Sequence, residues 1–593
     1  MPVANTRIHL KIFWAAASAL IAFRLFLAVC NPVWIDPDAL ADDILMLNYA
    51  NIFEHFSVWN TFSMAKTMSF PVFLGFIHIL GIPYNLAAGA LWVIGAFFTL
   101  WFFSHYINNI YGRLIVFAFM LYCPAAFDIW TGLRIYRQAI VAPTALIAIM
   151  CIFLLVTKLC IYGAGTNEKS AFRIIIILSI LAGLSFLFFY YVKEDSIWLA
   201  PLYVIASTMG VFVIVRRRPE RRTCIKLVFF ALLPLILFAG GTNAYKAVNY
   251  HYFGVFEINT RTGGEFGEFA GKLLQIEDGN KTDEVWVPYS TLEKAFQASP
   301  TLSGAPGLLE SLRRQEIYAD GDMVENPIPG DLVFWAFKVS LEEAGLYGSE
   351  VQAEMFFREA NRELDAAFRD GRLAKREGIA ITRSIPRRTP DEIAALWPLA
   401  REIFLYQAMW QWSSTKIHLI EHERLSTVES ALHVDIPSDW PDLTAANYAS
   451  FAVSNGVIDI YRRAAPFLLL MSLAGFLCWL LDRLRLKRQR RGDGQHKQED
   501  QAQDACIHQL SPVFAATIVL SGIILIAGVC WFIEWLYLGY HRQDISYTAS
   551  TVLNYYSCGA APLFMLLEIS GISYLLSVVF KAIRFPRRHS HSA

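Results

Sequence analysis

Four carboxylates lie within eight residues directly after the first apolar segment of the chain: Asp36, Asp38, Asp42 and Asp43. Paired carboxylates beside a membrane can accept a proton from a hydroxyl group or hold a divalent cation, Mg²⁺ or Mn²⁺, next to a phosphate. Asp38 can cap a short helix with Ile44 and Leu47 on one apolar face, and this helix would lie in the membrane interface with its carboxylates at the water edge. The same pattern is also typical of a solvated interfacial helix without chemistry.

Two arginines, Arg134 and Arg137, stand just ahead of a later apolar segment. At three-residue spacing on a helix their guanidinium groups would be neighbours and could clamp an anionic phosphate. A third charged group, Lys193-Glu194-Asp195, begins another apolar segment. Each group alone is also typical of a membrane edge, where long basic side chains reach the lipid head groups. Together, three loops that bring acids and bases to one face predict a substrate site.

A further pattern is the pentapeptide HLIEH at His418 to His422, in which two histidines at four-residue spacing share a helical face. Such a pair can hold zinc when a third ligand is present. The acids that follow show no spacing that selects a third ligand, so a solvated helix face is the favoured interpretation. Asp42 and Asp43 remain the only other candidates for a metal site.

Long apolar runs must position these groups. Residues 10–243 and 464–580 are nearly continuous apolar sequence, whereas residues 244–463 are rich in charges. Runs of this length and composition are typical of membrane-spanning helices, so we expect a mainly α-helical, polytopic membrane protein with about 10 to 12 spans. Its predicted parts are an N-terminal transmembrane domain (1–243) with an acidic first outer loop (31–66), a mainly helical soluble insert (244–463) and C-terminal transmembrane helices (464–593).

Three basic clusters set the predicted topology: residues 216–226, 483–491 and 581–588. Because basic residues favour the cytoplasmic side, the linker 483–509 and the C terminus are predicted to be inside. The insert and the loop 31–66 are then outside, on the periplasmic or outer side of a bacterial inner membrane. The clusters are interpreted as topological anchors, and no nucleic acid partner is expected. All nine cysteines lie outside the insert, which therefore cannot depend on disulfides.

Shorter patterns predict local structure. The apolar run 67–80 is short and is interrupted by Pro71 and Gly75, which indicates a re-entrant piece instead of a full span. Apolar residues at three-and-four spacing predict helices over 341–369 and 390–412 of the insert. A glycine-rich stretch at 262–271 predicts a loop.

The layout resembles a known superfamily. A first span, an outward loop with Asp42-Asp43 and the later motifs Tyr111-Gly112-Arg113 and Pro124 to Asp128 are similar to the GT-C superfamily of integral-membrane glycosyltransferases, over roughly residues 10–215. The resemblance implies transfer of a sugar from a polyprenyl-phosphate carrier to an acceptor, which is a glycan, a lipid or a protein, on the non-cytoplasmic face.

The resemblance also implies roles for the charged loops. A first-loop aspartate is the catalytic base or metal-site residue of that superfamily, which assigns this role to Asp42 or Asp43. Arg134, Arg137 and Lys193 become candidates for the lipid phosphate. The remaining acids of the expected substrate site are Asp36, Asp38, Glu194 and Asp195.

A second likeness covers other parts of the chain. The stretches 249–256, 330–338, 344–347 and 360–367 resemble a group of bacterial multi-pass membrane proteins, a likeness that implies no particular activity. Asn554-Tyr555 stands where an Arg-Tyr pair is expected before the last span, so no phosphate contact is predicted there.

A transporter, a lipid flippase or a non-enzymatic envelope-assembly protein is the alternative. Transporters commonly carry ionisable residues in the middle of their spans. Here such residues are few, chiefly Arg24, His78 and Glu568, whereas the charged loops gather at one face. No clear inverted repeat relates the two apolar halves. The distribution therefore favours interfacial chemistry.

Overall fold

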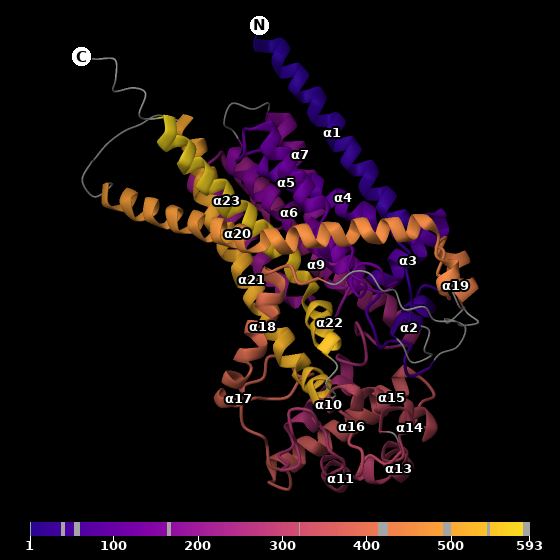
Figure 1. The fold of residues 1–593 in the computed structure, drawn as a ribbon. Coiled ribbons are helices and arrows are strands. Elements are labelled where there is room, and N and C mark those ends of the chain that lie inside the picture. The colour runs from indigo at the N-terminus through magenta and orange to yellow at the C-terminus, as the bar shows by residue number, and fades with distance from the viewer. Residues whose placement is uncertain are drawn as a thin grey trace.

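The described part of the chain is mainly helical, as the apolar runs predict (Figure 1). Isolated bridges are the only β pairing within the part of the chain that the structure describes. The computed structural model describes residues 2–36, 42–51, 60–162, 168–319, 321–412, 425–489, 500–542 and 546–584.

Nine helical segments of the described residues are long and apolar enough to cross a membrane, so the chain is a multi-pass membrane protein. They are α1 (Pro2–Cys30), α4 (Tyr84–Phe103), α6 (Gln138–Ile161), α7 (Glu168–Tyr190), α8 (Ala200–Arg217), α9 (Arg221–Phe253), α20 (Ala445–Gln489), α21 (Asp500–Arg542), and α22 (Ser546–Ser557) with α23 (Ala561–Arg584). Two more apolar helices, α3 (Ser69–Leu80) and α5 (Ile110–Leu121), have 12 residues each. At 1.5 Å per residue each is about 18 Å long, too short for a hydrocarbon core of about 30 Å.

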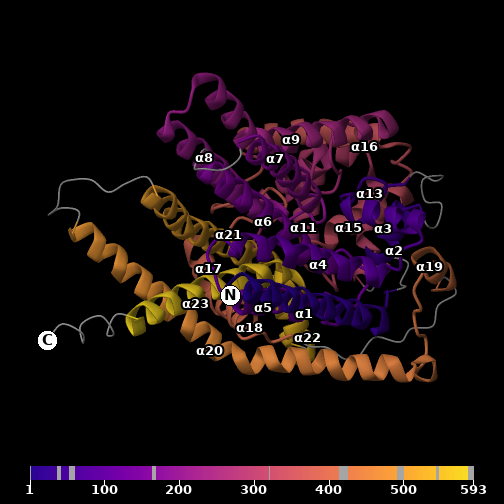
Figure 2. The ribbon, with the colours of Figure 1, turned by 90° about the horizontal axis from the view of Figure 1, so that it is seen from above.

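The core of the membrane part is α6. Nearly every side chain from Gln138 to Cys160 is buried, as expected for a helix that is apolar on all sides. Helices α4, α7, α8, α21 and α23 pack around it (Figure 2). The polar loop before α6 is thereby held in the centre of the bundle.

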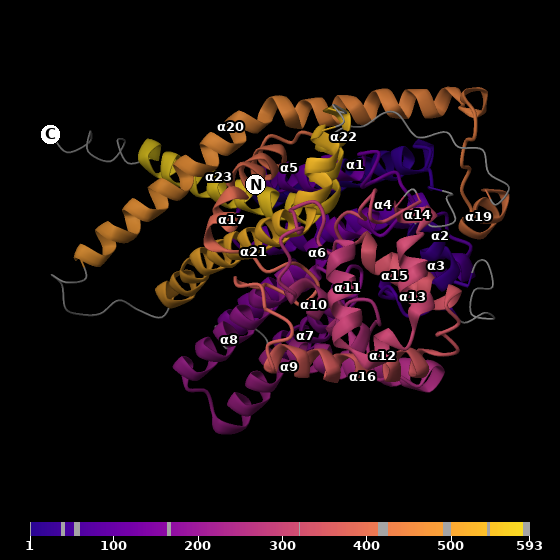
Figure 3. The ribbon, with the colours of Figure 1, turned by 90° about the horizontal axis from the view of Figure 1, so that it is seen from below.

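Helix α20 packs along α23 through small residues. A Cβ atom added to Gly475 would lie 1.9 Å from the carbonyl oxygen of Gly571, so glycine is required for the backbones to approach. Helix α20 also contains Pro466 and bends partway along its length (Figure 3).

The described residues of the charged insert form ten shorter α-helices. They are α10 (Gly264–Gln275), α11 (Tyr289–Ala298), α12 (Pro300–Ser303), α13 (Pro306–Arg313), α14 (Glu316–Ala319), α15 (Leu332–Glu343), α16 (Glu350–Arg369), α17 (Pro390–Ala395), α18 (Trp397–Ala408) and α19 (Leu425–Leu432). The predicted loop at 262–271 is wrong, because α10 begins at Gly264. Gly267 approaches the Thr262 backbone, which a Cβ atom would meet at 2.5 Å, so this glycine serves close packing and not a flexible loop.

The insert is continuous with the membrane helices. The predicted boundaries at 243/244 and 463/464 fall inside α9 and α20, which run on without interruption. Helix α18 packs against α21, α22 and α23, and Trp410 Nε1 donates to Glu568 Oε1 at 3.4 Å (Figure 3). The last part of the insert therefore lies against the C-terminal membrane helices.

Helix ends meet the insert at one end of the bundle (Figure 1). The C-terminal ends of α1, α7 and α9 and the N-terminal end of α6 all lie there. The loops that carry the predicted site residues are the connections of these ends, which is why residues far apart in the sequence come together.

Candidate functional site

Asp42 and Asp43 form the first turn of α2 (Asp42–Tyr49). Negative charge is favoured there by the unpaired amide groups and the dipole of the helix. The buried side chains of α2 are Asp43, Ile44, Met46, Leu47 and Tyr49. The predicted surface helix in the membrane interface is therefore wrong, because α3 packs against α2 and protein encloses it. Asp38, the predicted cap, lies outside the described residues.

Asp43 is held in a buried ion pair. Arg134 donates to it with two nitrogens, Nε to Oδ2 at 2.8 Å and NH2 to Oδ1 at 2.7 Å. The side chain of Asp43 is 0% exposed and that of Arg134 is 10% exposed. The Asp36 backbone amide also donates to Asp43 Oδ2 at 2.9 Å, and the Asp36 carboxylate lies 3.7 Å from Arg134 NH2. Asp43 and Arg134 thus neutralise each other's charge, and their ion pair joins α2 to the loop before α6.

The two arginines do not share a helix face. Residues 131–137 are not helical, because Trp34 pairs with Arg134 in a parallel bridge: Trp34 N donates to Leu133 O at 3.1 Å and Ile135 N donates to Trp34 O at 2.8 Å. The predicted helical clamp of Arg134 and Arg137 is therefore wrong. The extended backbone directs Arg134 to Asp43, and Arg137 to a different set of acids.

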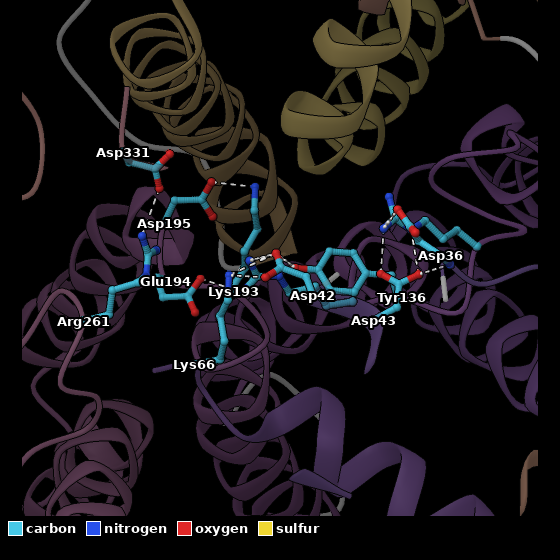
Figure 4. Close-up of polar contacts among 12 residues, drawn as sticks. Asp36, Asp42, Asp43, Lys66, Tyr136, Lys193, Glu194, Asp195, Arg261 and Asp331 are labelled. Atoms are coloured by element: carbon cyan, nitrogen blue, oxygen red, sulfur yellow. Dashed lines mark hydrogen bonds and ion pairs between the residues drawn. The ribbon is translucent and has the colours of Figure 1, made fainter. Parts of the chain in front are cut away.

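Asp42 faces the other side of α2, toward Lys66. The Lys66 ammonium lies 3.0 Å from both carboxylate oxygens, Tyr136 OH donates to Oδ2 at 2.5 Å, and Arg137 NH2 lies 3.8 Å away. In Figure 4 the Tyr136 ring lies between Asp42 and Asp43. The two aspartates are therefore separate sites. Asp42 is 36% exposed and is the one that a substrate can reach.

Arg137 links this group to the loop after α7. Its NH1 donates to Glu194 Oε2 at 2.6 Å. Arg137 Nε and Glu194 Oε1 are buried and have no hydrogen-bond partner within the described residues. A buried polar atom without a partner costs about 1–3 kcal/mol, so such atoms mark places where a ligand can bind.

Lys193 and Asp195 form a pair of their own. Their charged atoms are 2.7 Å apart, and the Lys193 ammonium lies 5.0 Å from the centre of the Tyr556 ring. Neither is in an ion pair or hydrogen bond with Asp42 or Arg137 in the described part of the chain. Of Lys193, Glu194 and Asp195, Glu194 is the one that pairs with Arg137. Asp42, Lys66, Arg137 and Glu194 are called the central cluster below.

The insert adds a further ion pair to the cluster. Arg261 NH1 donates to Asp331 Oδ2 at 3.0 Å, and the Arg261 guanidinium lies 4.9 Å from the centre of the Trp335 ring. Lys66 lies 4.6 Å from the centre of the same ring. Trp335 therefore connects the insert to the membrane half of the site.

The electrostatics of the central cluster follow from burial and from its cations. Burial would raise the pKa of Asp42, but Lys66 and Arg137 with the Tyr136 hydrogen bond outweigh it and hold the pKa well below its usual range. Burial likewise raises the pKa of Glu194, and Arg137, Lys66 and Arg261 outweigh it and lower the pKa to about 2. Both carboxylates are therefore ionised at neutral pH.

Lys66 has the opposite shift. Burial lowers its pKa to about 8, although Asp42 opposes the change. Lys66 therefore loses its charge at a lower pH than an ordinary lysine does.

An apolar groove of about 870 Å³ begins at this cluster and runs between α3, α7 and α9. Lys66 lines one part of it. The rest is mainly apolar, and Val72, Leu184, Val248 and Tyr252 are more than half exposed, so the groove is open to the surroundings of the membrane helices. A groove of this size with a few polar groups at one place is typical of a ligand site.

A divalent cation, for which Asp42 and Asp43 were candidates, does not fit this arrangement. No group of three or more metal-ligating side chains converges in the described residues. Asp42 already accepts from Lys66 and Tyr136, and Asp43 is enclosed with Arg134. A cation at Asp42 would require the Lys66 ammonium to leave. The His418 to His422 motif lies outside the described residues.

Several site residues were not predicted from the sequence: Lys66, Tyr136, Arg261, Asp331, Trp335, and Tyr555, whose ring stacks on that of Tyr136 at 6.2 Å between centres. Lys66 carried a usable signal, because it is the single Asp, Glu, Lys or Arg between Glu54 and Arg113. Tyr136 lies between two arginines that were already candidates. Arg261 and Asp331 carried no signal, because the insert contains many such residues.

Comparison of the sequence with models of known protein families finds no match, and comparison with curated proteins finds none either.

Proposed function

We propose that the chain is an integral-membrane glycosyltransferase that moves a sugar from a polyprenyl-phosphate carrier to a hydroxyl group of an extracytoplasmic acceptor. One observation carries the proposal: Lys66 lines the apolar groove and is also paired with Asp42. An isoprenoid chain is chemically suited to the groove, and its phosphate would then lie beside Lys66. Asp42, the proposed base for the acceptor hydroxyl, lies 3.0 Å from the same Lys66 ammonium.

Donor binding would also activate Asp42. An anionic phosphate attracts Lys66 and Arg137, which at rest hold the pKa of Asp42 low. As these cations turn to the phosphate, the pKa of Asp42 rises and the carboxylate becomes a better base. The base would thus be strengthened when a donor is present.

The transfer step follows from these positions. The acceptor hydroxyl attacks C1 of the sugar, and the bond between C1 and the phosphate oxygen breaks. The electron pair of that bond leaves with the polyprenyl phosphate, and the hydroxyl proton passes to Asp42. The buried Glu194 Oε1, which has no partner among the described residues, is available to accept a hydrogen bond from a second hydroxyl.

Lipid binding tests the groove. The full chain in nanodiscs is expected to bind polyprenyl phosphate about ten- to a hundredfold more tightly than the matched polyprenol, because the phosphate gains charge-assisted hydrogen bonds. Val248→Trp should weaken binding of both lipids by filling the groove. Val204→Trp is the matched control, because Val204 is similarly exposed (51% against 52%) but does not line the groove.

Transfer is tested on the same sample with polyprenyl phosphates that carry different sugars. Release of polyprenyl phosphate supports the proposal. Tight lipid binding without release, together with movement of the lipid between leaflets, would instead support the flippase alternative. Equal binding of the phosphate and the polyprenol would remove the basis of both.

The affinity for polyprenyl phosphate is expected to fall about tenfold between pH 7 and pH 9. The pKa of Lys66 is about 8, so its protonated fraction falls from about 0.9 to about 0.1 over this range, and affinity follows the competent fraction. The second pKa of a phosphate monoester is near 6, so the ligand keeps its charge. Lys66→Arg should remove the pH dependence, and a slope that persists in this variant would contradict the assignment.

Unfolding cannot mimic this result. The pKa of Lys66 in the folded chain lies below the ordinary value of 10.5. Between about pH 8 and pH 10.5 the unfolded chain therefore binds more protons, and the contribution of this group to stability rises with pH. Affinity and stability should change in opposite directions.

A further inference from the structure

The insert fixes one arginine at the edge of the membrane site. Thr260 N donates to Met64 O at 2.8 Å, which joins the insert to the loop that carries Lys66. The buried Asn259 side chain accepts from the backbone amides of Arg261, Thr262 and Gly263 and so fixes the turn. Arg261 is therefore held by its own backbone, independently of its ion pair.

The side chain of Arg261 is placed to bind more than Asp331. It is 11% exposed, and in Figure 4 its guanidinium lies between Asp331 and Glu194. Its Nε is buried and has no hydrogen-bond partner in the described part of the chain, as is also true of Arg137 Nε. Arg137 and Arg261 thus each have one guanidinium N–H without a partner in the described residues, and both act on the carboxylate of Glu194.

Three cations therefore surround one small region. Lys66, Arg137 and Arg261 all act on the carboxylate of Glu194. Lys66 belongs to the loop before α3 and Arg261 belongs to the insert, but both cations lie over the same Trp335 ring. A tetrahedral anion with several acceptor oxygens matches these donors better than a second carboxylate.

We propose that Arg261 is a binding residue for the phosphate head group of the lipid, and that Asp331 is its resting partner, which the phosphate displaces. The insert then supplies part of the head-group site. The inference rests on the proposed lipid-phosphate ligand, but its test requires no sugar transfer.

Two substitutions give opposite expected results. Arg261→Ala removes a donor of the phosphate and should weaken polyprenyl phosphate binding about ten- to a hundredfold, with little effect on polyprenol. Arg261→Lys should restore only part of the affinity, because lysine lacks the guanidinium fork. Asp331→Asn frees Arg261 from its carboxylate and should strengthen binding severalfold. A purely structural ion pair predicts that both changes weaken binding.

Arg313→Ala is the matched control, because Arg313 also pairs with an aspartate, Asp322 at 3.3 Å, and lies over an aromatic ring, but it is exposed. Binding is measured with polyprenyl phosphate and polyprenol on the full chain in nanodiscs. If the unchanged chain does not prefer the phosphate, the proposed function fails. If it does, and Arg261→Ala binds equally well or Asp331→Asn binds more weakly, only this inference is overturned.

Discussion

Asp42→Asn is expected to lower sugar transfer from a polyprenyl-phosphate donor by about a hundredfold or more, because the amide cannot accept the proton of the acceptor. The protein should stay folded. The asparagine oxygen can still accept from Lys66 and Tyr136, and the side chain is partly exposed. Donor binding should persist below neutral pH, because the amide leaves Lys66 and Arg137 free for the phosphate. Without the Asp42 charge the pKa of Lys66 falls further, so the affinity should decline at a lower pH than in the unchanged chain.

The measurement is release of polyprenyl phosphate beside donor affinity and the unfolding midpoint of the same samples. Asp370→Asn is the control, since Asp370 is an exposed acid of the insert that is paired with Arg372. Unchanged turnover in Asp42→Asn would remove Asp42 from the chemistry, and loss of donor affinity would assign it to binding instead.

Asp43→Asn should behave differently and lower the free energy of unfolding by about 3–5 kcal/mol. The change leaves the buried Arg134 guanidinium without its bidentate partner. Burial would lower the pKa of Arg134, but Asp43 outweighs it and raises that pKa, so the arginine stays charged. The uncompensated buried charge of Arg134 is what lowers the free energy of unfolding.

A paired replacement separates charge from packing. Asp43→Leu with Arg134→Met removes both charges and should recover much of the stability that Asp43→Asn loses. The readout is the denaturant midpoint in detergent, with Glu359→Gln as a control in an exposed pair with Arg362. Equal midpoints for the unchanged protein and Asp43→Asn would contradict the buried pair.

The sequence was informative where the signal is local. Apolar runs predicted the membrane helices, and the density of acids after the first span pointed to residues that the structure brings close to Arg134, Arg137 and Glu194. The roles of Asp42 and Asp43 could not be separated, because only the fold decides which carboxylate pairs with Arg134 and which pairs with Lys66. The transfer activity and the sidedness of the membrane remain predictions.

The errors have physical causes. Arg134 and Arg137 have the spacing of helical neighbours, but a bridge to Trp34, far away in the sequence, extends the backbone between them. Gly264 and Gly267 suggested a loop, although the second glycine allows a helix to pack against Thr262. Lys66 and Arg261 became visible only through tertiary contacts. Such contacts depend on packing between distant segments, which residue spacing does not encode.

The buried pair of Asp43 and Arg134 also has a consequence for biosynthesis. The two residues are 91 positions apart, so at about 5–20 residues per second the ribosome needs about 5 to 18 seconds to add the partner. During that interval the Asp43 carboxylate has been synthesised but its partner arginine has not. Arg261 and Asp331 are made later still and are separated by 70 positions. The site is therefore assembled in the order of synthesis. The Asp43–Arg134 ion pair can form while the insert is still being made, and the Arg261–Asp331 ion pair can form only afterwards.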